Sequence, residues 1–127
     1  MDELIAKLTQ AAGIDEATAR NAVAIILSFL KKEAPAEHVD QALAAIPGAE
    51  QAAAATDGGA AGAMAGLGGL MGGGGLMALA GQLTGAGLSM GQMQAVAKEL
   101  FAHVREKAGE DVVGGIVAAV PGLSQFV

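Results

Sequence analysis

The fold of this chain is decided by residues 12–51, which read AGIDEATARNAVAIILSFLKKEAPAEHVDQALAAIPGAEQ. Residues 86–125 read AGLSMGQMQAVAKELFAHVREKAGEDVVGGIVAAVPGLSQ and align with them without a gap, at a constant offset of 74. Apolar positions and helix-breaking residues coincide along the alignment, including the Pro-Gly pairs that begin at Pro47 and Pro121. The sequence therefore predicts one structural unit that is present twice.

The first copy predicts three helices separated by short breaks. Residues 2–12 carry an apolar stripe with helical spacing. Asp15 is a favourable N-cap for a long helix with the same periodicity. Pro35 ends that helix, because proline cannot continue the backbone ladder, and begins a third helix that extends to Ile46.

The second copy predicts the same three helices from different residues. Residues 76–83 carry the first apolar stripe, and Ser89 with Gln92 three residues later forms a capping-box signature for the long helix. Gly109 provides the next break. The valine-rich run 112–120 would favour a strand on propensity alone, but its apolar spacing predicts a helix.

We expect residues 1–127 to form a single all-α domain. Two pseudo-equivalent three-helix units cover 2–47 and 76–121, a Gly/Ala-rich linker covers 48–75, and 122–127 form a tail. The units should pack their apolar stripes against each other as one helical bundle with pseudo-twofold symmetry. The alternative is exchange of units between two chains through the linker, which would give a homodimer.

The sequence between the copies has no charged residue from Gly58 to Ala97 and is rich in glycine. Because glycine disfavours helix, we expect a mobile linker with a few docked apolar residues. A second interpretation uses Gly-xxx-Gly spacings such as Gly62/Gly66, which permit close helix packing in lipid. A third is an apolar interaction strip in water. The run Gly72–Gly75 has too little hydrophobicity for a spanning helix, so membrane contact is not favoured.

The composition argues against several classes of function. The chain carries a net charge of -6 and three phenylalanines as its only aromatic residues, so nucleic-acid binding is not expected. It has no cysteine, and its glycines are not followed by the Gly-Lys-Ser or Gly-Lys-Thr of a phosphate loop. The acidic N-terminus lacks the layout of a secretory signal, so we expect a cytoplasmic protein.

The two histidines do not suggest an active site. His38 aligns with Val112 and His103 aligns with Phe29, so neither position is polar in both copies. We expect His38 to be a solvated side chain near a helix start. We expect His103 to form a surface ion pair with Glu99, one turn before it on the same helix. The sequence therefore predicts no catalytic residue, no metal ligand and no cofactor.

The methionines cluster in the linker and just after it, and filling of the core is the first interpretation of them. The second is an adaptable groove for a partner helix, lined by Met77, Met90, Met93 and Phe101. We expect a non-catalytic interaction or scaffold protein that binds a protein partner or an apolar ligand. The alternatives are a membrane-surface or lipid-associated protein that acts through the Gly/Leu/Met-rich segment and, least favoured, an enzyme.

The layout resembles a family of small uncharacterised bacterial proteins, the VcgC/VcgE-type domain of unknown function. The resemblance is carried by the Pro-Gly stop at Ala44–Gly48, the Gly/Ala/Leu linker at Gly58–Gly75 and the Gly-Leu-Ser helix start at Gly87–Ser89. The glycine- and leucine-rich YidB-like family is similar less closely. Neither resemblance implies an activity or a catalytic residue.

Overall fold

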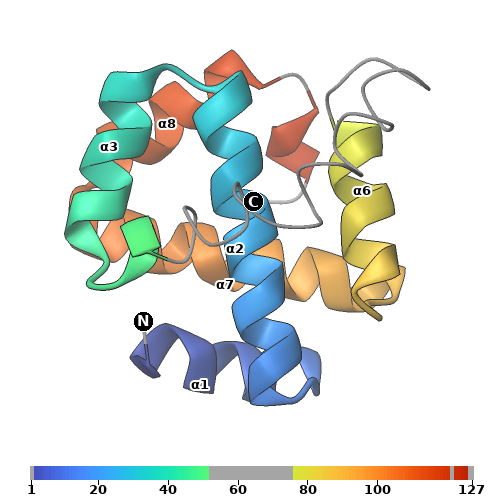
Figure 1. Ribbon diagram of the computed structural model, residues 1–127. Helices are drawn as coiled ribbons and strands as arrows, with labels where there is room; N and C mark the ends of the chain where they lie inside the picture. Colours follow the sequence, from blue (N-terminus) through green and yellow to red (C-terminus); the bar gives the residue numbers. More distant parts are fainter. Residues whose placement is uncertain (1, 52–75, 121, 126–127) are drawn as a thin grey trace.

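The computed structural model describes residues 2–51, 76–120 and 122–125, and all regular structure in these ranges is helical (Figure 1). The side chains of residues 32, 76–78 and 125 also lie outside the description. The helices are α1 (Asp2–Ala12), α2 (Glu16–Glu33), α3 (Ala36–Ala45), α6 (Leu76–Gly85), α7 (Met90–Ala108), α8 (Glu110–Ala119) and the 3-10 helix η1 (Leu123–Gln125). The predicted all-α fold is confirmed.

The two long helices start at the N-caps predicted from the sequence. The Asp15 carboxylate accepts a hydrogen bond from the Thr18 backbone N–H at 3.3 Å, in front of α2. In front of α7, the Ser89 hydroxyl accepts from the Gln92 N–H, and the Gln92 side chain accepts from the Ser89 N–H at 2.9 Å. Each cap satisfies backbone donors that the first helical turn leaves without a partner.

The breaks between helices also lie where they are expected. Pro35 precedes α3 with φ at -58°, the value to which its ring restricts it. Gly109 separates α7 from α8 with φ at 104°, a conformation that side chains with a Cβ rarely adopt. Both α7 and α8 start 74 residues after α2 and α3, respectively, as the alignment requires. The internal duplication itself stays a prediction.

The short helices α1 and α6 pack mainly on the long helix from the other half of the chain. The most extensive helix contact is that of α1 with α7, and α6 contacts α2 more than α7. Figure 1 shows α1 below the crossing of α2 and α7, with α6 at the right. Helices α3 and α8 meet on the opposite side from α6. The two halves are therefore interlocked around one core.

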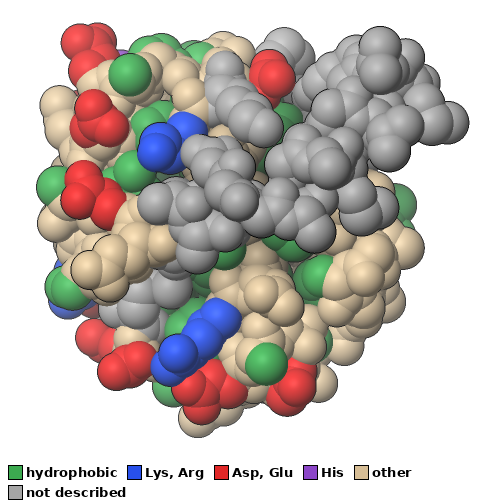
Figure 2. All heavy atoms as spheres, viewed as in Figure 1, with side chains coloured by type: hydrophobic (Ala, Val, Ile, Leu, Met, Phe, Trp, Pro, Cys, Tyr) green, Lys and Arg blue, Asp and Glu red, His purple; other side chains and the backbone are tan. Residues whose placement is uncertain are grey.

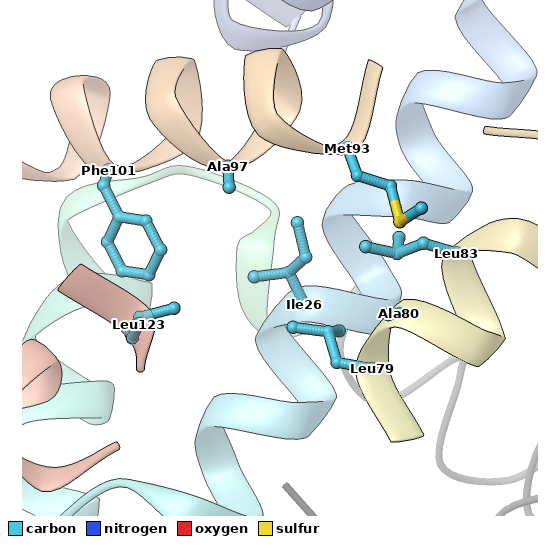
Figure 3. Close-up of a pocket in the computed structure, with 8 residues that line it drawn as sticks. All are labelled: Ile26, Leu79, Ala80, Leu83, Met93, Ala97, Phe101 and Leu123. Atoms are coloured by element: carbon cyan, nitrogen blue, oxygen red, sulfur yellow. The ribbon is translucent and has the colours of Figure 1, made fainter. Parts of the chain in front are cut away.

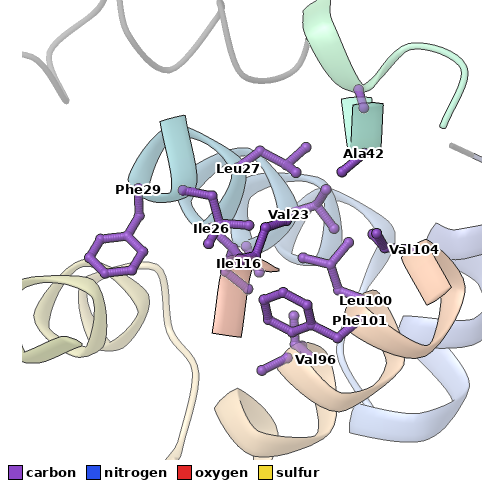
Figure 4. Packing of buried hydrophobic residues seen from close by; sticks show 14 of the residues in the cluster. Val23, Ile26, Leu27, Phe29, Ala42, Val96, Leu100, Phe101, Val104 and Ile116 are labelled. Carbon is purple, nitrogen blue, oxygen red and sulfur yellow. The ribbon is translucent and has the colours of Figure 1, made fainter. Parts of the chain in front are cut away.

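One cluster of buried apolar side chains holds both halves together. Figure 4 shows Val23 and Ile26 of α2, Leu100 and Phe101 of α7, and Ile116 of α8 meeting within it. Phe29 lies apart from this group, with its ring directed away from the other labelled side chains (Figure 4). Burial of apolar surface from both halves in one cluster makes the bundle a single packed unit.

The predicted linker and tail are only partly within the described residues. Linker residues 52–75, and with them the Gly62/Gly66 spacing, lie outside these residues. Residues 49–51 are helical, and Ala49 is buried against the core. In the tail, Leu123 of η1 is also buried. Across the described ranges, no helix is both long enough and apolar enough to cross a membrane.

Candidate functional site

Helix α6 forms the outer wall of an apolar cleft. Its sequence supplies Leu79 and Leu83 as its buried large side chains, and the small Ala80 between them also lines the cleft. Small residues on a helix leave space beneath it unless the facing side chains fill that space. The side chains of α2 and α7 beneath α6 do so incompletely.

The cleft lies between α6, α2, α7 and η1 (Figure 3). Its cavity volume is about 20 Å³, within a hollow of about 360 Å³ that is partly open to solvent. A space of that size holds roughly one water molecule. All of the side chains that line it are apolar: Ile26, Leu79, Ala80, Leu83, Met93, Ala97, Phe101 and Leu123.

The lining residues form two groups in Figure 3. The thioether of Met93 lies beside Leu83 at one end, and the ring of Phe101 lies beside Leu123 at the other, with Ile26 between them. None of these side chains can donate a strong hydrogen bond or hold a charge. The site can therefore accept an apolar group by burying its surface, and it has no means of fixing a polar one except the backbone.

The four residues predicted to line a partner groove are only partly brought together. Met93 and Phe101 both line the cleft, and both are buried. Met90 does not line it and is 68% exposed. Met90 is the first residue of α7, where helical side chains lean toward the N-terminal end of the helix. The side chain of Met77 lies outside the described residues.

The sequence pattern indicates only part of the cleft. Leu79, Ala80 and Leu83 belong to the apolar stripe of residues 76–83, and Ile26 to the apolar face of the long helix after Asp15, and such faces predict burial without indicating a cleft. A usable signal is the alignment itself. Ala97 aligns with the larger Val23, so the second half has less side-chain volume at this place than the first.

The predicted surface ion pair of His103 is wrong. The side chain is 3% exposed, and its Nδ1 atom is buried without a hydrogen-bond partner in the described part of the chain. Desolvation by burial lowers the pKa of His103, and the positive charge of Lys7 lowers it further. The helical register explains the error, because His103 lies next to Val104 and on the same face as Leu100, both of which are buried.

The predicted solvation of His38 is correct only in part. His38 is half-buried, and its Nδ1 atom has no hydrogen-bond partner among the residues described. Its imidazole lies against Gly115 of α8 so closely that a Cβ built on that glycine would stand 2.7 Å from Nε2. The sequence predicts neither the burial of Nδ1 nor the contact with Gly115, because both depend on how α3 and α8 pack together.

The acidic side chains within the described ranges lie on the surface, and only Glu99 among them is half-buried. Figure 2 shows acidic groups at several separate places around one face of the molecule. Lys7 bridges Glu3 at 3.9 Å and Glu106 at 3.6 Å, and Arg20 pairs with Glu16 at 2.7 Å. In residues 2–51, 76–120 and 122–125, no group of three His, Cys, Asp or Glu side chains is placed to hold a metal ion.

Comparison with known proteins does not add a functional assignment. No protein family, no curated protein and no solved structure matches the chain. The resemblance to the VcgC/VcgE-type and YidB-like families therefore stays an expectation from the sequence.

Proposed function

We propose that this chain is a non-catalytic helical interaction protein and that the cleft beneath α6 accepts an apolar side chain of a partner helix. The observation that carries the proposal is the entirely apolar lining of a cleft whose outer wall, α6, makes fewer contacts with the bundle than α1 does. A methionine and a phenylalanine in one hollow supply an adaptable and a rigid apolar surface, respectively.

Helix α1 supports a helical partner as the occupant. It packs mainly on α7, and its Leu4 and Leu8, which are one turn apart, are fully buried in the core. The long helices of this bundle thus already receive leucine side chains from an amphipathic helix. A partner helix with apolar residues at i, i+3 or i+4 would offer the cleft the same kind of side chain.

The size of the cleft argues against the alternative of a bound lipid. The enclosed part of the cleft, about 20 Å³, is too small for a whole small molecule, whose sites are roughly 300 Å³ or larger, and a partner side chain would enter through the part of the hollow that is open to solvent. One side chain inserted from a helix needs less space than an acyl chain. We therefore place a partner helix before an apolar small molecule, and a cytoplasmic location and the absence of a cofactor remain part of the proposal.

Photo-crosslinking from inside the cleft tests the proposal. A photoreactive diazirine analogue of leucine, close to leucine in size, is placed at Leu83, which lines the cleft, and in a matched variant at Ala102, an exposed alanine of α7. After illumination in the cells of origin, we expect the Leu83 variant to give an adduct that peptide mapping assigns to an amphipathic helix of one protein. The Ala102 variant should not give that adduct.

A second variant tests whether the adduct depends on binding in the cleft or only on a partner being near α6. Ala97→Val introduces into the cleft the residue that aligns with it in the first half, Val23. It should reduce the adduct formed from position 83 while the helical circular dichroism signal is unchanged. Equal labelling from positions 83 and 102, or an adduct that Ala97→Val leaves undiminished, would show that the cleft is not the binding site. Adducts to phospholipid alone would favour the lipid-associated alternative.

A further inference from the structure

Two buried polar atoms in the described residues have no hydrogen-bond partner, and both are histidine Nδ1 atoms. His103 is the more deeply buried of the two side chains. A buried polar group without a partner costs roughly 1–3 kcal/mol, and such groups are rare in folded proteins. The buried imidazole of His103 is therefore an unfavourable feature that apolar packing alone does not explain.

His103 lies where α7 packs against α1. The charged groups that act on its imidazole come from these two helices, in the part of the chain that the structure describes: Lys7 and Glu3 from α1, and Lys107 and Glu106 from α7. Lys7 and Glu106 form an ion pair at 3.6 Å that joins the two helices. The imidazole is thus buried at an interface whose exposed rim carries mixed charges.

We propose that His103 makes the packing of α1 on α7 sensitive to pH, so that protonation of its imidazole loosens α1. The two lysines and two glutamates offset one another, so the added positive charge has no dedicated counter-ion. A buried charge without a partner is costly in a folded protein. Movement of α1 away from α7 would let water reach the imidazolium, and it would break the Lys7–Glu106 pair.

The direction of the effect follows from the pKa. Burial holds the pKa of His103 below the ordinary value of 6.5 that it has in the unfolded chain. As the pH falls through 6.5, the unfolded chain takes up a proton before the folded chain does, and the folded state loses stability. The full stability is present above 6.5, and the loss is complete below the pKa of the folded state.

The first test is an NMR titration of the wild-type imidazoles. The chain has two histidines, so two ring signals are expected, and His38→Val assigns them by removing one. We expect the His103 signal to titrate below the ordinary histidine pKa. Titration of His103 at or above that value would overturn the proposal, whether or not any other variant folds.

The second test follows stability and amide exchange between about pH 7.5 and about pH 5, a window above the ordinary pKa values of Asp and Glu. On acidification, protection factors of α1 amides should fall several-fold while those of α3 change little. His103→Phe, which introduces the residue that aligns with His103 in the first half, should abolish this loss because a phenyl ring does not titrate. His38→Val should retain it. An undiminished acid response in His103→Phe, or equal loss of protection in α1 and α3, would overturn the proposal.

Discussion

Helices α1 and α6 precede the two long helices, and they differ in how completely they pack. Leu4 and Leu8 of α1 are fully buried in the core, and the contact of α1 with α7 is the most extensive between the described helices. Leu79 and Leu83 of α6 are buried nearly as well, but a cleft remains beneath them. One short helix thus closes the core, and the other leaves an apolar hollow.

The comparison teaches that similar apolar stripes do not produce similar packing. Leu8-Thr9 of α1 aligns with Leu83-Thr84 of α6, and each threonine hydroxyl donates to a carbonyl of its own helix at 2.8 Å. One difference beneath α6 is Ala97, which lines the cleft and aligns with the larger Val23. A valine at position 97 would bring two further methyl groups to the cleft, so the smaller residue leaves space there.

The largest expected effect on the free energy of unfolding comes from removing a leucine from each short helix. Leu8→Ala should lower the free energy of unfolding by about 4 kcal/mol, because the tight contact of α1 with α7 cannot collapse around the cavity. Leu83→Ala should cost about 2 kcal/mol, because it borders a space that is already open. Chemical denaturation followed by far-ultraviolet circular dichroism measures both.

The two variants remove the same side chain from aligned positions, so each is the control of the other. An equal or greater cost for Leu83→Ala would contradict the difference between the two helices and would mean that α6 is packed as firmly as α1.

A second difference between the halves is the contact of α3 with α8. His38 of α3 lies against Gly115, whereas the aligned residues are Val112 and Gln41. A Cβ at position 115 would meet three imidazole atoms within 2.8 Å, so Gly115→Ala should lower the free energy of unfolding by about 2 kcal/mol. Chemical denaturation of the two single variants Gly115→Ala and Gly114→Ala measures the effect.

Gly114→Ala is the matched control, because a Cβ there meets nothing within 4 Å. It should raise the stability by about 0.5–1 kcal/mol through helix propensity alone. The double variant His38→Ala with Gly115→Ala should recover part of the loss. If Gly115→Ala is as stable as Gly114→Ala, the imidazole does not hold its place against α8.

The smallest expected effect on stability comes from removing either N-cap, and the two N-caps should differ in how that effect depends on pH. Ser89→Ala should cost about 1 kcal/mol at any pH, because a hydroxyl does not titrate in this range. The hydrogen bonds from Thr18 hold the pKa of Asp15 below its ordinary value of 3.8. The contribution of Asp15 is therefore present above 3.8 and is lost as the pH falls through the pKa of the folded state.

Thermal unfolding of wild type, Asp15→Ala and Ser89→Ala at a series of acidic pH values measures this difference. The gap between wild type and Asp15→Ala should narrow on acidification, and the gap to Ser89→Ala should stay constant. A gap that narrows equally for both variants would assign the acid sensitivity to another group.

The helices were predictable because their signals are local. Asp15, Ser89, Pro35 and Gly109 act on the backbone within a few residues, and the structure places helix ends beside each of them. The helical prediction for the valine-rich run at 112–120 is confirmed by α8, where spacing outweighed propensity.

The cleft and the histidine environments were not predictable in the same way, because they depend on contacts between distant helices. Met93 and Phe101 were found since they lie on one apolar face of α7, but Leu123 and Ile26 reach the same hollow from η1 and α2. The burial of His103 depends on α1, which precedes it by most of the chain. Helical periodicity reports which face is apolar and does not report which neighbour covers that face.

The interlocked packing of α1 on α7 has a consequence for how the chain folds as it is synthesised. A nascent chain that has been made only as far as α3 contains no α7 for α1 to pack against. Since synthesis proceeds at roughly 5–20 residues per second, several seconds pass between the synthesis of α1 and that of α7, its main contact. Helical proteins usually fold fast through local contacts, but this contact closes a loop that spans most of the chain. The N-terminal helix is the first to be made and should be among the last to reach its final position.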